Sequence, residues 1–239
     1  MKSLVIIPTY NEIENIDLII PAVLQAEDSV EILVVDDNSP DGTAASVQRL
    51  MSRYKNRLHL LSRAQKNGLG RAYLAGFQWA LEQDYWAVIQ MDADFSHNPD
   101  DIPKILEGLK DHHWVVGSRY VDGVNVVNWP LSRILLSYGA SKYVRWITNM
   151  PIKDPTAGFN GIRMEVLKKI DFKAVKFVGY AFQIEMKYLS WKLGFKHLEI
   201  PIIFTNRKRG VSKMHGNIIW EALYGVIYLR LFKIKQKEI

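Results

Sequence analysis

The sequence places two carboxylates two residues apart, in Asp92-Ala93-Asp94, directly after an apolar run with the composition of a buried strand. In an extended chain such side chains point the same way, and a local bend brings both near one cation. Hard oxygen ligands select Mg²⁺ or Mn²⁺, which keep coordination positions open for substrate phosphates. The alternative is that the pair only stabilises a loop. Its place at a strand end within an α/β pattern favours the metal site.

A second acidic pair, Asp36-Asp37, ends another apolar run. A carboxylate at such a point often accepts hydrogen bonds from a nucleoside, as the acidic residue of dinucleotide-binding folds does with a ribose. For Asp36 a turn or helix cap with residues 38–40 is an equally good interpretation. For Asp37 that alternative is weaker.

Cations that could hold phosphates are found in the second half of the chain. Residues 207–213 (RKRGVSK) form a compact basic cluster around a glycine. Arginine forks and a lysine point charge suit phosphate oxygens, although a solvated loop would have the same composition. Arg119, Arg133 and Arg145 are further candidates.

The elements that must position these groups alternate regularly in the first half. Strands are expected at 4–8, 31–37, 58–62, 85–91 and 114–118, and helices at 11–26, 41–54, 68–82 and 99–110. This alternation predicts βαβ units, and therefore an α/β fold with a mainly parallel sheet and helices on both faces. Ligands of such sheets bind at the carboxyl ends of the strands, where Asp37, Asp92 and Arg119 fall.

The second half changes character without an intervening linker, so we expect one domain. Helices are expected at 131–147, 180–193 and 218–234, a strand at 197–204, and loops at 154–163 and 206–213. In the helices 131–147 and 218–234, apolar and basic side chains are interleaved. We expect their apolar faces to contact a membrane surface; the alternative is that they pack on the sheet as core.

Composition and charge exclude several classes of protein. The 239 residues, 48% hydrophobic and 23% charged, are too apolar for a disordered chain. The absence of cysteine excludes disulfide scaffolds, thiol nucleophiles and iron–sulfur clusters. No uncharged apolar stretch of about 18 residues exists, so no membrane span is expected. The net charge of +6 is concentrated after Lys192, among aromatic residues, which suits an anionic membrane better than nucleic acid.

Two further patterns argue against other nucleotide-binding folds. No G-x-G-x-x-G follows the first strand and no Walker lysine is present, so dehydrogenases and P-loop enzymes lack their defining residues. Residues 68–71 (GLGR) resemble a phosphate-binding turn, but we interpret them as the tight start of a helix. The six histidines have no metal-ligand spacing.

Six segments together resemble glycosyltransferase family 2 in their order and spacing: IPTYNE, VVDDNSPDGT, MDADFSHNP, VVGSRY, DPTAGF and NRKRGVSK. Within that family the chain is similar, over residues 2–215, to polyprenyl (dolichyl)-phosphate mannosyltransferases that lack transmembrane helices. The resemblance implies a GT-A fold over 1–239, with a nucleotide-sugar half (1–120) and an acceptor and membrane-facing half (121–239). It also implies inverting transfer of mannose from GDP-mannose to a polyprenyl phosphate, by a peripheral protein on the cytoplasmic face of a membrane.

The resemblance also assigns site residues. The nucleoside would be held by Pro8, Tyr10, Glu12, Val35 and Asp37. The diphosphate and a divalent metal, Mg²⁺ or Mn²⁺, would be held by Asp92, Ala93 and Asp94, with the metal on Asp92 and Asp94. Acceptor and donor phosphates would be received by Arg119, Arg133, Ser137, Arg207 and Lys213. Ser96 stands where some relatives carry a metal-ligating Gln, which leaves a third protein ligand in question.

The catalytic assignments implied are Asp94, Arg119 and Asp154. Arg119 would stabilise phosphate charge near the reacting centre. Asp154 stands where other members place a base, and it could instead orient substrate or cap its loop. A phosphate monoester is largely a dianion near neutrality, so this acceptor needs no strong base.

Other functions remain as alternatives. The sugar donor could be UDP-glucose or a UDP-N-acetylhexosamine, or the acceptor a saccharide. A non-catalytic nucleotide-binding or membrane-binding subunit is more remote, because the Asp92/Asp94 pair is intact. The sequence sets no oligomeric state.

Overall fold

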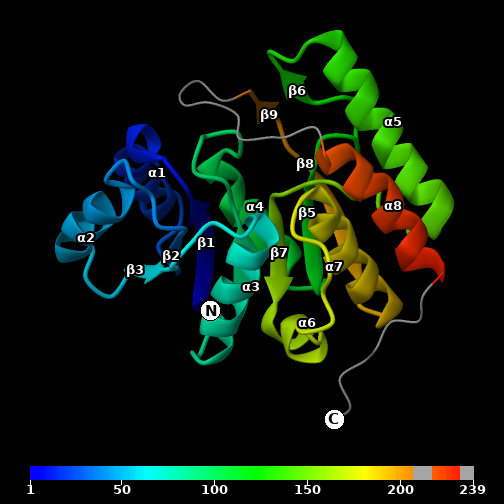
Figure 1. Ribbon diagram of the computed structural model, residues 1–239. Helices are drawn as coiled ribbons and strands as arrows, with labels where there is room; N and C mark the ends of the chain where they lie inside the picture. The colour runs from blue at the N-terminus through cyan, green and yellow to red at the C-terminus, as the bar shows by residue number, and fades with distance from the viewer. Residues whose placement is uncertain (207–216, 232–239) are drawn as a thin grey trace.

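A seven-stranded sheet forms the centre of the computed structural model, which describes residues 1–206 and 217–231 (Figure 1). The strand order is β3-β2-β1-β4-β7-β5-β8. The strands are β1 (Ser3–Thr9), β2 (Val30–Asp36), β3 (Leu58–Ser62), β4 (Ala87–Gln90), β5 (Trp114–Ser118), β7 (Asn160–Arg163) and β8 (His197–Pro201). All neighbours pair in parallel except β7, which is antiparallel to both β4 and β5. The predicted mainly parallel α/β sheet is confirmed.

Helices cover both faces of this sheet because its central strands are apolar on both sides. On one face, Val5 and Ile7 of β1 pack with α1 (Ile13–Ala26), α2 (Thr43–Arg53) and α4 (Ile102–Gly108). On the other face, Leu4 and Ile6 pack with α3 (Leu69–Leu81), α6 (Met164–Lys169) and α7 (Tyr180–Lys192). Successive side chains of one strand thus enter two different cores.

The start of α3 confirms the interpretation of the glycine-rich residues 68–71. Gly68 has a φ of 95°, which other residues rarely adopt, and the helix begins at Leu69. A Cβ on Gly70 would lie 2.8 Å from the ring of Phe182, so the second glycine permits close packing of α3 against α7.

The prediction of a loop throughout 154–163 is wrong at its end, because Asn160–Arg163 form β7. Asn and Gly have low strand propensity, and the sequence NGIR therefore does not resemble a strand. Tertiary contacts override that propensity. Trp114 Nε1 donates to Asn160 Oδ1 at 3.1 Å, and a Cβ on Gly161 would collide with Ile105 and Leu109.

The second half adds a helical layer beside the sheet. Helices α5 (Leu131–Thr148) and α8 (Asn217–Leu231) lie side by side, and α8 also packs on α7 (Figure 1). Two short parallel strands, β6 (Val126–Val127) and β9 (Phe204–Thr205), form a second sheet, and β6 lies near the start of α5. In the part of the chain that the structure describes, no helix has both the length and the apolarity to cross a membrane.

Candidate active site

The predicted acidic residues meet at the carboxyl edge of the sheet. β1 and β2 end in register at Thr9 and Asp36, and the backbone N–H of Asp37 donates to the carbonyl of Thr9 at 3.0 Å. Asp92 follows β4, the other neighbour of β1. The strand-edge rule therefore brings together groups that lie far apart in the sequence.

Asp36 and Asp37 have different environments. Asp36 accepts hydrogen bonds from the Thr9 hydroxyl and from the backbone and hydroxyl of Ser39, so it closes the turn that the sequence offered as one alternative. Asp37 pairs with Arg63, whose Nη1 lies 2.5 Å from Oδ1. Burial raises the pKa of Asp37, and the Arg63 guanidinium opposes that rise.

The remaining nucleoside candidates surround the same strand ends. Pro8 and Val35 are opposite each other in the β1–β2 register. The backbone N–H of Glu12 donates to the Thr43 hydroxyl at 3.0 Å, which fixes the turn after β1. The Nζ of Lys66 lies 4.4 Å from the ring centroid of Tyr10. Sequence reasoning missed Lys66 and Arg63, whose only signal is their position after β3.

The metal candidates lie in the turn after β4. Asp94 is buried, and its Oδ1 accepts from the Ser96 backbone N–H at 3.1 Å. The Ser96 hydroxyl is buried and has no hydrogen-bond partner among the described residues. Within the same part of the chain, no three His, Asp or Glu side chains are arranged for a metal. Two carboxylates and an unpaired hydroxyl are hard donors that fit Mg²⁺ or Mn²⁺ sharing its remaining positions with phosphate oxygens.

The side chain of His97 stabilises the turn that carries Asp92 and Asp94. Its Nδ1 accepts the backbone N–H of Asp92 at 3.1 Å, and its ring stacks on Phe159 at 4.9 Å between centroids. Burial lowers the pKa of His97 to about 4, so the imidazole is neutral at pH 7. The histidine spacing gave no sign of this contact, because it joins a side chain to backbone rather than to a metal.

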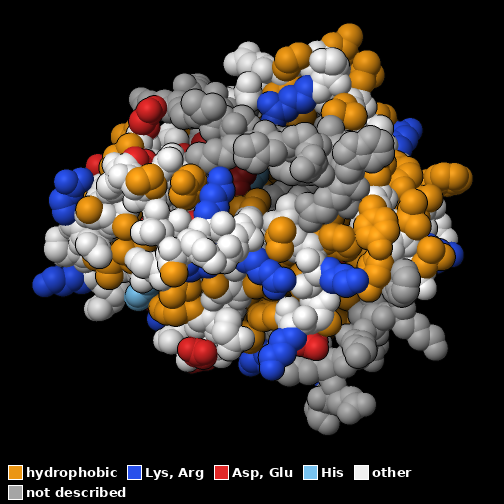
Figure 2. Space-filling model, in the orientation of Figure 1, with side chains coloured by type: hydrophobic (Ala, Val, Ile, Leu, Met, Phe, Trp, Pro, Cys, Tyr) orange, Lys and Arg blue, Asp and Glu red, His pale blue; other side chains and the backbone are white. Residues whose placement is uncertain are grey.

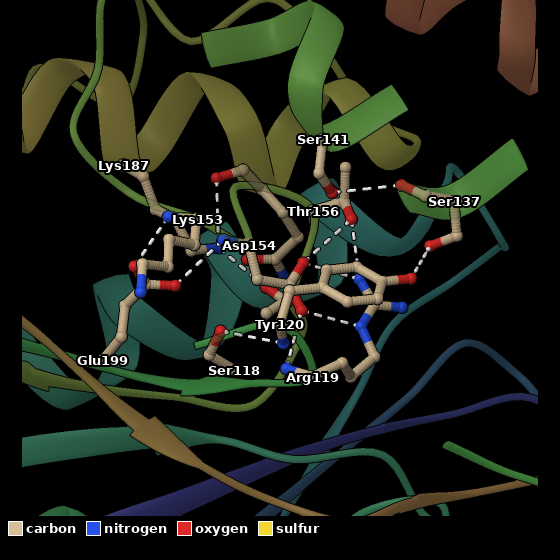
Figure 3. Close-up of polar contacts among 12 residues, drawn as sticks. Ser118, Arg119, Tyr120, Ser137, Ser141, Lys153, Asp154, Thr156, Lys187 and Glu199 are labelled. Carbon is tan, nitrogen blue, oxygen red and sulfur yellow. Dashed lines mark hydrogen bonds and ion pairs between the residues drawn. The ribbon is translucent and has the colours of Figure 1, made fainter. Parts of the chain in front are cut away.

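Arg119, directly after β5, forms a two-pronged ion pair with Asp154 (Figure 3). Nε donates to Oδ2 and Nη2 to Oδ1, both at 2.7 Å, and the backbone N–H of Arg119 donates to Oδ2 at 2.9 Å. Nη2 also donates to the Thr156 hydroxyl at 2.7 Å. Burial by itself would raise the pKa of Asp154, but the Arg119 guanidinium holds it below its usual value. Asp154 is therefore an anion at neutral pH.

Two charged groups hold the loop that carries Asp154. Glu199 of β8 accepts the backbone N–H of Asp154 at 2.9 Å and that of Lys153 at 2.6 Å. The fully buried Lys187 of α7 donates from Nζ to the Ala157 carbonyl at 2.7 Å. Burial lowers the pKa of Lys187 to about 7.

The structure brings two of the predicted acceptor residues towards Arg119. Tyr120 donates its hydroxyl hydrogen to the Ser137 hydroxyl at 2.8 Å. The guanidinium of Arg133 lies 4.0 Å from the centroid of the Trp129 ring, which the Arg119 guanidinium approaches to 5.6 Å.

Of the other predicted cations, the structure places one, Arg145, and that one lies away from this site. Arg145 is twelve residues farther along α5, roughly 18 Å away along the helix. Arg207 and Lys213 lie outside the described residues.

The metal turn and the Arg119 region are in contact through one ring. Phe204 of β9 lies 5.6 Å from the His97 ring and 5.7 Å from the Arg119 guanidinium. Phe204 thus links the turn after β4 to the guanidinium of Arg119.

Comparison with known proteins identifies the family of the chain. Residues 4–171 match the sequence profile of Glycosyl transferase family 2. The chain belongs to that family. This confirms the resemblance to family 2, and the chain is accordingly a glycosyltransferase.

Three relatives match nearly the whole of this chain, and the third of them is a longer protein. The chain is 47% identical over 226 residues to a polyprenol monophosphomannose synthase of Mycolicibacterium smegmatis, covering 94% of this chain and 85% of that protein. It is 42% identical to an undecaprenyl-phosphate mannosyltransferase of Micrococcus luteus, covering 95% and 93%. It is 39% identical to a dolichol-phosphate mannosyltransferase of Pyrococcus furiosus, covering 93% and 62%.

A solved structure of lower identity has the same fold. Glucosyl-3-phosphoglycerate synthase of Mycobacterium tuberculosis, in complex with Mn²⁺, uridine diphosphate and phosphoglyceric acid, superposes with a TM-score of 0.70 at 18% identity. The match covers 97% of this chain and 79% of that one. The expected GT-A type of fold is confirmed.

Proposed function

We propose that this family-2 enzyme transfers mannose from GDP-mannose to a polyprenyl phosphate, with inversion at the anomeric carbon. The observation that carries the proposal is the meeting of Arg119, Arg133 and Ser137 beside the turn that holds Asp92 and Asp94. The relatives named for mannose transfer to polyprenol, undecaprenyl and dolichol phosphates support the choice of substrates.

The donor lies, in this proposal, along the edge from β2 to β4. Asp37 and Tyr10, with Pro8, Val35 and Glu12 around them, hold the nucleoside. Asp92 and Asp94 hold Mg²⁺ or Mn²⁺. When bound, that ion neutralises the charge that develops on the departing nucleoside diphosphate.

The acceptor phosphate lies between Arg119 and Arg133. A phosphate monoester is already largely a dianion near neutral pH, so its oxygen attacks without a strong general base. Asp154 then has a different task. Both of its oxygens accept from Arg119, so it fixes the direction of that guanidinium rather than removing a proton. Arg207 and Lys213 remain candidates for further phosphate contacts.

The membrane-facing side, in this proposal, is formed by α5 and α8. Figure 2 shows hydrophobic side chains gathered along this side of the molecule, with Lys and Arg among them. Leu131 and Trp146 of α5 are 70% and 77% exposed, and Leu231 of α8 is 72% exposed. The core alternative holds for another face of α8, where Val226 is buried.

Such apolar side chains flanked by cations suit the headgroup region of an anionic leaflet. The cytoplasmic leaflet has that charge, so we place the enzyme peripherally on the cytoplasmic face.

A transfer assay tests the proposal. Radiolabelled GDP-mannose, UDP-glucose and UDP-N-acetylglucosamine are each offered with polyprenyl phosphate, with Mg²⁺, with Mn²⁺ or with chelator. We expect lipid-linked mannose only from GDP-mannose and only with metal. Transfer from a UDP sugar instead would replace the donor assignment, and no transfer with any donor would show that polyprenyl phosphate is not the acceptor and favour a saccharide.

A further inference from the structure

Trp129 contacts two cations to which the proposed function assigns the acceptor phosphate. Its ring centroid is 4.0 Å from the Arg133 guanidinium carbon and 5.6 Å from that of Arg119. Phe204 packs edge-on against the same ring, with centroids 5.3 Å apart at 73°. The indole is therefore held in place by the protein and presents its electron-rich face to guanidinium groups.

The two arginines differ in how their charge is balanced. Arg119 is paired with the Asp154 carboxylate. In the described part of the chain, no carboxylate lies within ion-pair distance of Arg133, whose Nη1 donates instead to the neutral amide oxygen of Asn206 at 3.1 Å. Among the described residues the positive charge of Arg133 is therefore met by a neutral amide oxygen and an aromatic ring rather than by a carboxylate, which suits an arginine that binds an anion.

The position of Arg133 on its helix is unfavourable for a cation, so neighbouring side chains must stabilise its guanidinium. It stands in the first turn of α5, where the positive end of the helix dipole disfavours a cation. A free arginine there would also sample many rotamers, and ordering them on substrate binding would weaken affinity. Contacts with the Trp129 ring and the Asn206 side chain fix the guanidinium before the phosphate binds.

We propose that Trp129 is a positioning residue for the acceptor phosphate, acting through Arg133. The inference rests on the proposed function, because it takes Arg133 as a phosphate ligand. The Trp129 Nε1–H is buried and has no acceptor among the described residues, so hydrogen bonding does not explain the indole at this position. The face of the ring does explain it, since indole binds cations better than other aromatic rings do.

A double-mutant cycle between Trp129→Leu and Arg133→Ala tests this coupling. Farnesyl phosphate in detergent micelles serves as acceptor, so that membrane adsorption does not enter the measurement. We expect Trp129→Leu to raise the KM for farnesyl phosphate roughly 3- to 30-fold, the range of a cation–π contact, and to leave the KM for GDP-mannose unchanged. In the Arg133→Ala background the same substitution should have little further effect. Trp129→Phe, which keeps an aromatic face, should recover much of the lost affinity.

Several outcomes would overturn the inference. If the effects of Trp129→Leu and Arg133→Ala multiply independently, or if the KM for GDP-mannose rises equally, Trp129 acts only through general packing. If Arg133→Ala leaves the KM for farnesyl phosphate unchanged, the acceptor assignment itself is wrong. Should Trp129→Leu not fold, the same cycle with Trp129→Phe decides: a smaller KM increase that disappears in Arg133→Ala supports the coupling, and one that persists refutes it.

Discussion

Arg119 and Asp154, 35 residues apart in the chain, form a buried ion pair with two parallel hydrogen bonds of 2.7 Å. A lysine at position 119 keeps the charge but has no planar fork to match both carboxylate oxygens. We expect Arg119→Lys to lower kcat/KM for transfer about 10- to 100-fold. Arg145→Lys, on the exposed part of α5, should behave like wild type. Wild-type transfer by a folded Arg119→Lys variant would refute the role of the fork.

Removing the other partner of the same pair should also affect stability. Asp154→Asn leaves the Arg119 guanidinium buried without its counter-charge, which costs about 3–5 kcal/mol of unfolding free energy. Urea unfolding of this variant, beside Asp100→Asn on the exposed surface, measures the difference. If Asp154→Asn unfolds at the same urea concentration as the control, the pair does not stabilise the fold.

Asp94 offers a direct test of the metal site. Its Oδ1 accepts a hydrogen bond from the Ser96 backbone N–H, and an amide oxygen at this position can accept that bond equally well. We expect Asp94→Asn to fold normally and to lose at least ~100-fold in turnover at limiting Mn²⁺. The matched control is Asp101→Asn, a buried aspartate paired with Lys104. Equal turnover of the two variants would show that Asp94 is not a metal ligand.

Lys187 should make the stability of the protein depend on pH. Burial lowers its pKa to about 7, whereas a lysine in the unfolded chain titrates near ~10.4. Between these values the unfolded state binds more protons, so the free energy of unfolding should rise as pH increases from 7 towards 10. Lys187→Met should flatten this rise, and the exposed Lys168→Met should not. Urea titrations at several pH values between 7 and 10 measure how the free energy of unfolding changes with pH in the wild type and the two variants. The same pH dependence in all three proteins would contradict the expectation.

The exposed apolar face of α5 can be tested without an enzyme assay. Flotation with anionic liposomes should carry wild type upwards, and Leu135→Glu should weaken the association about tenfold or more, because burial of a leucine contributes roughly 1.5–3 kcal/mol. Leu18→Glu changes an exposed leucine of α1 and should have no effect. Equal flotation of both variants would assign the membrane contact to another surface.

Local sequence determined the first half of the fold and the chemistry of its edge. Apolar runs such as 4–8 and 31–37 are buried from both sides, so their periodicity identifies them as central strands without knowledge of their neighbours. Once these strands are parallel, the carboxyl-edge rule alone brings Asp37 and Asp92 together. The family motifs carried this further, to the enzyme class.

Tertiary structure decided what the acidic and basic groups do. The strand at Asn160–Arg163 exists because Trp114 and α4 fit its polar and small residues, against local propensity. Asp154 became the partner of Arg119, and Trp129 that of Arg133, through contacts that no periodicity encodes. The hydrophobic periodicity of a segment indicates which face of a helix or strand is buried. Which charged side chains form pairs depends on how segments far apart in the sequence come together in the folded protein, so only the three-dimensional structure reveals it.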